Sequence, residues 1–136
     1  MKSIKIILLS GVFTLITLFC VNHSYSQSLQ FCESVSNDGY PVSESSVFTI
    51  SEKGGFLKFL VKLPYTIGTN KVTYEIYKID SDGYENYDNT IYQDVEGSWT
   101  WFWKEVTFYQ AGRYNIYVYD GDKNFLTSEI VRIQYQ

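Results

Sequence analysis

Carboxylates and aromatic rings, rather than imidazoles or thiols, are the side chains through which this chain could do chemistry. Its 136 residues include 15 acidic residues, 13 tyrosines and three tryptophans, but one histidine and two cysteines. The histidine, His23, lies in an N-terminal segment that we expect to be removed. A domain without imidazole has no Ser–His or Cys–His nucleophile pair and no His-containing zinc site. Paired carboxylates could hydrolyse glycosides, but these acids fall mainly on turns and exposed faces, so we expect no enzyme.

Two acidic segments resemble fragments of calcium-binding loops. Asp80 and Asp82 precede a glycine, with Asp88 shortly after, and a second fragment spans residues 120–124. Calcium takes six to eight oxygen ligands, which neither fragment supplies alone. Asp-Gly is also the favoured chemistry of tight turns between strands. We therefore expect no cofactor, with a structural calcium ion at Asp80, Asp82 and Asp88 as the alternative.

The first 26 residues have the pattern of a cleavable signal peptide. Lys2 and Lys5 form a positive start, residues 6–21 are uncharged and largely apolar, and Ser24 and Ser26 are small. This pattern predicts cleavage before residue 27. The apolar run has 16 residues, fewer than the ~20 that a spanning helix needs, so no membrane span is expected after cleavage.

The alternative to cleavage before residue 27 is a lipid anchor attached at Cys20. Phe19 is bulky where lipoprotein signals place a small residue, which argues against that anchor. The sequence thus predicts a domain of residues 27–136 that is secreted, periplasmic or on the cell surface.

The charge of that domain restricts its partners. Loss of Lys2 and Lys5 lowers the basic count from 11 to 9 against 15 acidic residues, giving a net charge of −6. Such a domain is repelled by nucleic acid and by anionic membranes. Cys32 would be its only cysteine, so no internal disulfide can form and stability must come from an apolar core.

Short apolar runs separated by turn residues organise the domain. Lys71 to Ile79 alternates, with Val72, Tyr74 and Ile76 on one face. Similar runs recur every 8–12 residues, and none has a helical period, which is typical of a sandwich or barrel. We predict seven or eight antiparallel strands: 29–35, 47–50, 56–63, 71–79, 89–95, 99–108, 113–119 and 125–135.

The segment Tyr109 to Ile116 resembles the E–F corner of immunoglobulin-like and fibronectin-like domains. In that family a tyrosine after a small residue packs under the turn and its hydroxyl bonds the backbone upstream. Tyr114 matches this tyrosine, and Ile116 stands where the family has its second cysteine. The resemblance implies an immunoglobulin-like β-sandwich with Phe59 or Leu60 opposite Ile116, and it implies no function.

Aromatic side chains provide the candidate binding residues. If Tyr114 and Ile116 face the core, strand alternation turns Tyr117 and Tyr119 outward, and Tyr77 is outward on the neighbouring strand. Exposed tyrosines could stack on sugars or form the centre of a protein interface, and tyrosine is also simply a good strand former.

The three tryptophans, at positions 99, 101 and 103, share one face of their strand, and we expect at least one of them in the core. Trp99 is the one that we add to the candidate binding residues.

These observations predict a non-catalytic interaction module of the cell envelope that binds a protein partner. The first alternative is a carbohydrate-binding module that holds envelope polysaccharide on its exposed tyrosines. The second is an accessory subunit of a surface fibre, joined by strand addition at a sheet edge.

Overall fold

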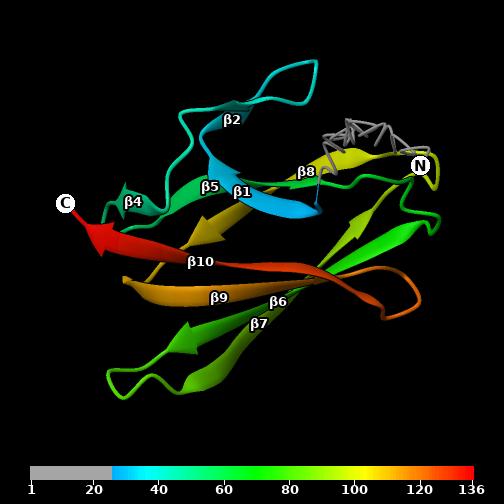
Figure 1. The fold of residues 1–136 in the computed structure, drawn as a ribbon. Coiled ribbons are helices and arrows are strands. Elements are labelled where there is room, and N and C mark those ends of the chain that lie inside the picture. Colours follow the sequence, from blue (N-terminus) through cyan, green and yellow to red (C-terminus); the bar gives the residue numbers. More distant parts are fainter. Residues whose placement is uncertain (1–25) are drawn as a thin grey trace, which may run out of the picture.

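The computed structural model describes residues 26–136, which form β-strands and connecting loops. Figure 1 shows β1, β5 and β8 in the upper part of the view, β10, β9, β6 and β7 below them, and β2 at the top. The strands are β1 (Ser28–Cys32), β2 (Ser34–Val35), β3 (Pro41–Val42), β4 (Val47–Ile50), β5 (Gly55–Lys62), β6 (Lys71–Ile79), β7 (Glu85–Asp94), β8 (Trp101–Phe108), β9 (Gly112–Tyr119) and β10 (Phe125–Tyr135).

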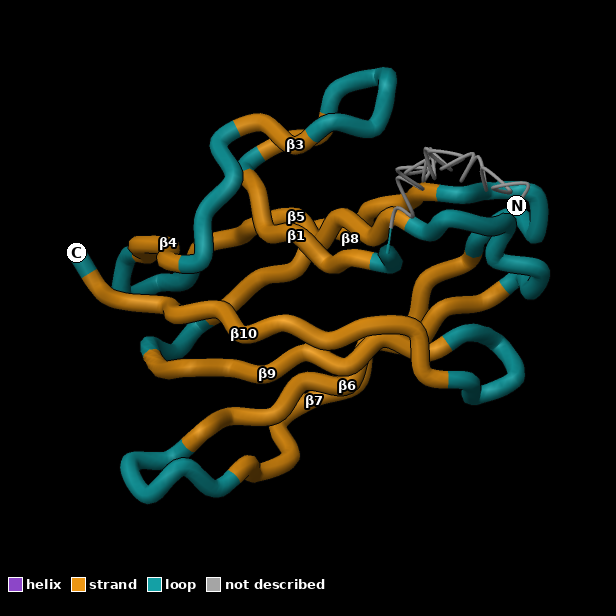
Figure 2. Tube along the Cα trace, in the orientation of Figure 1, coloured by secondary structure: helices purple, strands orange, loops and turns teal. Residues whose placement is uncertain are grey.

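Two sheets pack face to face. One has the strand order β1-β5-β8 and the other β4-β10-β9-β6-β7, while β2 and β3 form a separate hairpin. The order corresponds to strands A, B and E of an immunoglobulin-like domain against strands G, F, C and an added C′, with β4 as an extension of the first strand. The expected immunoglobulin-like β-sandwich is therefore confirmed (Figure 2).

The core lies between the sheets and is apolar throughout. Val72, Tyr74 and Ile76 of β6 are buried there as their alternation predicts. Ile116 shares this core with Phe59, whereas Leu60 is buried outside the cluster that fills the space between the sheets. Aliphatic and aromatic packing thus occupies the position of the family's disulfide.

Tyr114 makes the expected tyrosine corner. Its ring is 2% exposed and lies 4.9 Å from the ring of Phe108, between centroids. Its hydroxyl donates to the carbonyl oxygen of Gln110 at 2.8 Å. Burial of the phenol raises the pKa of Tyr114 to about 12. The side chain thereby fixes the turn that leads into β9.

The prediction of seven or eight antiparallel strands is wrong in two respects. The described residues form ten strands, because the polar stretch after β1 contains the two-residue strands β2 and β3, which are too short to show alternation. In addition, β4 pairs with β10 in the parallel direction. This pairing lets the first part of the chain cross from one sheet to the other.

The prediction that a tryptophan enters the core is also wrong. Phe102, Val106 and Phe108 are the inward residues of β8, so alternation turns Trp101 and Trp103 to the outer face. Each of these rings has a close neighbour on that face. The β2–β3 hairpin covers Trp101, and the Lys58 ammonium group lies 4.3 Å from the ring centroid of Trp103.

The predicted signal peptide and Cys20 lie outside the described residues, apart from Ser26. Within residues 26–136, no helix has the length and apolar character needed to cross a bilayer.

Candidate functional site

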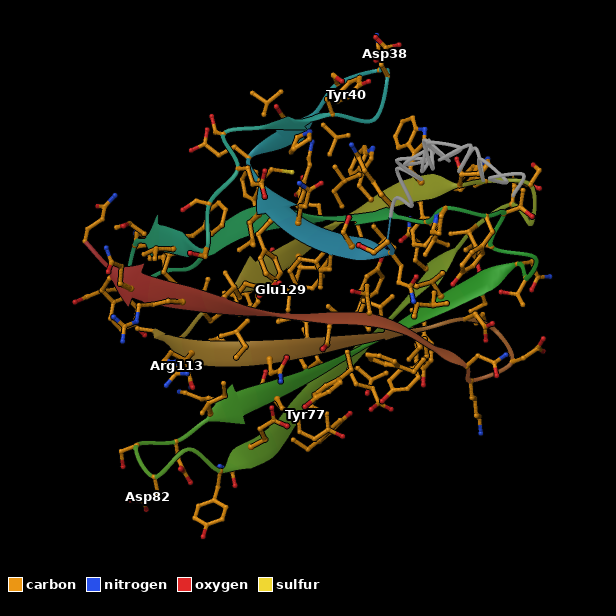
Figure 3. The ribbon with its side chains drawn as sticks, viewed as in Figure 1. Asp38, Tyr40, Tyr77, Asp82, Arg113 and Glu129 are labelled. Carbon is orange, nitrogen blue, oxygen red and sulfur yellow. The ribbon has the colours of Figure 1, made fainter. Side chains whose placement is uncertain are left out.

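The outer face of the five-stranded sheet gathers the tyrosines that the sequence singles out. Tyr114, Ile116 and Val118 of β9 are buried, and Tyr117 and Tyr119 point to the opposite side. Tyr77 of the adjacent strand β6 meets Tyr117 edge to face, with ring centroids 5.5 Å apart. Figure 3 places Tyr77 on this sheet near the β6–β7 edge.

Further aromatic residues, which the sequence reasoning missed, extend this group across four strands. The ring centroid of Tyr87 on β7 lies 5.8 Å from that of Tyr77. The ring centroid of Phe125 on β10 lies 6.0 Å from that of Tyr119 and 6.5 Å from that of Tyr117. Tyr92 shares the face because it pairs with Thr73, which in turn pairs with Tyr119. We call this set the aromatic face: Tyr77, Tyr87, Tyr92, Tyr117, Tyr119 and Phe125.

Two β-bulges explain why strict alternation does not reveal the whole aromatic face. The register between β6 and β7 shifts at Tyr77, which brings Tyr87 and Tyr92 to one side although they are five residues apart. A second shift, between Phe125 and Thr127, turns Phe125 outward while Leu126 enters the core. A bulge inserts one residue and reverses the alternation beyond it.

Hydrogen bonds hold the hydroxyl groups of the aromatic face in place. Tyr117 donates to the Glu85 carboxylate at 2.7 Å, and the Asn115 side-chain amide donates to the Tyr117 hydroxyl at 3.0 Å. The Tyr77 hydroxyl donates to Glu75 at 3.3 Å. The rings are thus fixed in orientation, so that little conformational entropy remains to be lost when a partner binds.

The surroundings of Tyr77, Tyr117 and Tyr119 raise the pKa of each phenol. The hydrogen bond to Glu85 is the main cause that raises the pKa of Tyr117 to about 12. Loss of hydration raises the pKa of Tyr77 and of Tyr119, with the Glu75 carboxylate as the next cause in both. The hydroxyls of Tyr77, Tyr117 and Tyr119 therefore lose their protons at higher pH than an ordinary tyrosine.

The aromatic face is a broad surface rather than a cleft. The described hollows of the molecule are lined by other residues, such as those near Gly121, Glu44 and Trp101. Tyr87, Tyr92 and Phe125 nevertheless expose 63%, 62% and 55% of their side chains. Large exposed rings on a flat surface are typical of a protein interface rather than of a small-molecule pocket.

Trp99 does not join the aromatic face. It lies beside Gln93 and Ser98 in a groove of about 590 Å³ where β7 and β8 are the free edges of their sheets. The Gln93 side chain bridges this seam by donating to the Trp103 carbonyl oxygen at 2.7 Å. The sequence therefore grouped Trp99 with tyrosines that belong to a different surface.

The acidic segments proposed for calcium form tight turns. One oxygen of Asp80 accepts from the backbone nitrogens of Asp82 and Tyr84, both at 2.9 Å, and the other lies 3.4 Å from the Asn86 amide. Asp88 belongs to β7 instead of this turn. Both Asp80 oxygens thus have turn-closing roles.

Asp120 has the same role in the turn between β9 and β10. One of its carboxylate oxygens accepts from the backbone nitrogens of Asp122 and Asn124, both at 2.9 Å. This turn lies beside the loop after β5, because the Gly121 nitrogen donates to Thr69 Oγ1 at 2.9 Å.

The chain from residue 26 onward contains no cluster of three or more His, Cys, Asp or Glu side chains arranged to hold a metal ion. Its one cysteine, Cys32, is buried, and loss of hydration raises the pKa of the thiol. The aromatic face is therefore the feature from which a function can be argued.

Comparisons with known proteins add the following. No family model and no curated protein matches this chain. Among solved structures, it is similar to an immunoglobulin-like protein from Pseudomonas aeruginosa, with a TM-score of 0.46 and 11% sequence identity over 79% of this chain and 92% of the other. The fold is assigned here from the strand order and the tyrosine corner.

Proposed function

We propose that this chain is a non-catalytic interaction module of the cell envelope that docks a protein partner on the aromatic face. The observation that carries the proposal is the connected run of rings from Tyr87 through Tyr77 and Tyr117 to Phe125. The envelope location rests on the predicted signal peptide.

Two properties of the aromatic face favour a protein over a sugar. Its rings meet at steep angles, 78° between Tyr77 and Tyr87 and 88° between Tyr77 and Tyr117, so neighbouring rings do not form one flat stacking platform. Carboxylates hold the hydroxyls of Tyr77 and Tyr117, and the hydroxyl of Tyr87 bonds that of Thr90, so the three tyrosines of the connected run are fixed in orientation. Tyrosine-rich surfaces of this kind supply large contact area at low entropic cost.

The proposal is tested by affinity capture from the native envelope with two matched double variants. Tyr87→Ser with Phe125→Ser removes the most exposed rings at the two ends of the connected run. Phe56→Ser with Tyr109→Ser removes rings of similar exposure, 62% and 66%, that lie outside the aromatic face. We expect the first pair to lose the captured partner at least tenfold and the second pair to keep it. Equal retention by both pairs would contradict the proposal.

A carbohydrate-binding function has one specific observation in its favour, and it concerns the groove instead of the tyrosines. Trp99 and Trp103 expose 42% and 40% of their side chains in a groove that Asp94 and Ser98 also line. Aromatic rings beside hydrogen-bonding groups suit a sugar. Trp99→Ser should abolish retardation of the domain in polysaccharide-containing gels if this function holds, whereas Tyr87→Ser should not.

A further inference from the structure

The pairing of strands arranges the outer face of the five-stranded sheet as four rows of four side chains. The first row runs from Tyr92 to Phe125 and the second from Thr90 to Ser128. The third runs from Tyr87 to Ile130, and the last from Glu85 to Arg132. In order from β7 to β10, the rows are Tyr92-Thr73-Tyr119-Phe125, Thr90-Glu75-Tyr117-Ser128, Tyr87-Tyr77-Asn115-Ile130 and Glu85-Ile79-Arg113-Arg132.

The two ends of each row are complementary to each other. A two-fold axis that runs along the strands between β6 and β9 would place β7 of one copy over β10 of another. The exposed pairs Tyr92 with Phe125 and Tyr87 with Ile130 would then meet across the interface. In the first and third rows, the apolar residue at one end would therefore contact the apolar residue at the opposite end of the same row in the other copy.

The last row matches in charge under the same operation. Glu85 is its acidic end on β7, and Arg132 is its basic end on β10. The Glu85 carboxylate already accepts from the Tyr117 hydroxyl and the Asn115 amide, and the lone pairs that these contacts leave can accept from an arginine. Arg113 is the direct cross-strand partner of Arg132, and both are exposed. Like charges in this position destabilise a sheet, and a carboxylate from outside would relieve that repulsion. These are the only arginines of the chain, and they stand in one row.

We propose that the partner on the aromatic face is a second copy of this chain, joined by a two-fold axis along the strands, with Glu85 of each copy bound to Arg132 of the other. This inference rests on the proposed function, since it names the occupant of the same surface. Two-fold symmetry is the commonest arrangement of homo-oligomers and requires such a self-complementary patch.

The size of the patch indicates a weak dimer. Four strands and four rows cover about 15 Å by about 20 Å between Cα positions, from the ordinary strand spacing and rise. The buried surface is then on the order of 600 Å² per copy, at the low end of specific interfaces. We expect weak dimerisation with a dissociation constant that rises with salt, because the Glu85–Arg132 contacts are screened.

Sedimentation velocity of residues 26–136 tests the inference. This segment holds every described strand and the whole described core, and circular dichroism checks the folding of each variant. Glu85→Arg places two basic groups together at each of the two contacts, and Arg132→Glu places two acidic groups together. Each variant alone should dimerise at least tenfold more weakly than the original chain. An equimolar mixture of the two should dimerise about as well as the original, because each contact then regains opposite charges.

Several outcomes would overturn the inference. A chain that stays monomeric up to about 1 mM refutes the second copy, and so does a dimer that neither charge reversal weakens. Failure of the mixture to recover refutes the Glu85–Arg132 contact if both variants are folded. A monomer whose aromatic face still captures a different envelope protein refutes only this inference. A monomer whose aromatic face captures no protein refutes the proposed function as well.

Discussion

Gly39→Ala should destabilise the domain more than Gly83→Ala, and the difference measures how firmly the β2–β3 hairpin is seated. Both glycines occupy equivalent turns at positive φ, +82° and +86°. A Cβ at Gly83 has no heavy atom within 4 Å, whereas a Cβ at Gly39 would lie 2.7 Å from two ring atoms of Trp101. Gly83→Ala therefore isolates the backbone strain, and Gly39→Ala adds a clash with the indole.

The magnitudes follow from these two contributions. Left-handed backbone costs a residue with a Cβ about 1 kcal/mol, and forcing a ring out of a packed position costs roughly 1–3 kcal/mol. We expect losses of about 1 kcal/mol for Gly83→Ala and about 3 kcal/mol for Gly39→Ala. At about 4 °C per kcal/mol for a domain of this size, the melting temperatures should fall by roughly 4 °C and roughly 12 °C.

Urea unfolding followed by tryptophan fluorescence provides the free energies. The emission maximum of the native state reports on the three tryptophans, of which Trp101 is the one that the hairpin covers. Gly39→Ala should shift native emission to longer wavelength because the hairpin lifts from the ring, and Gly83→Ala should leave it unchanged. Equal losses in the two variants, with no shift in emission, would refute the packing of the hairpin on Trp101.

Three further predictions concern single side chains. Lys123 occupies the third equivalent turn at φ +65°, so Lys123→Gly should raise the free energy of unfolding by about 0.5–1 kcal/mol, measured by urea titration. Tyr114→Phe removes the 2.8 Å bond to Gln110 and should cost about 1 kcal/mol, and no change would contradict the tyrosine corner. The folded-state pKa values of Tyr74, Tyr114 and Tyr117 lie above the ordinary value of 10. The contribution of these tyrosines to the free energy of unfolding should therefore be fully present below pH 10 and should fall between pH 10 and 12, because tyrosines of the unfolded chain ionise first. A free energy of unfolding that does not change over that range would contradict these pKa shifts.

The alternation of apolar and polar residues along the sequence identified the strands that have one face against the core. Residues 71–79 form β6 with the predicted bounds, and Tyr114 and Ile116 are buried as predicted. Alternation works there because each of these strands has one face against the core and one against solvent. The orientation of Tyr77, Tyr117 and Tyr119 followed from the same rule.

The sequence was less informative where a contact depends on distant parts of the chain. Tyr87 and Phe125 reach the aromatic face through bulges, which reverse the alternation and leave no signal in composition. At least one tryptophan was expected in the core, but the hairpin around Gly39 covers Trp101 on the outer face, and nothing in the sequence of that hairpin indicates this contact. Trp99 could not be separated from the tyrosines before the strand order placed β7 and β8 in different sheets.

Position-specific photocrosslinking in the cells that make the protein is the most direct test of the account. A benzophenone side chain replaces Tyr87 on the aromatic face or, as the matched control, Phe56 on the other sheet. The account predicts a discrete protein adduct from position 87 and none from position 56, with twice the mass of the domain if the partner is a second copy. Adducts from position 56, or their absence from position 87, would contradict docking on the aromatic face.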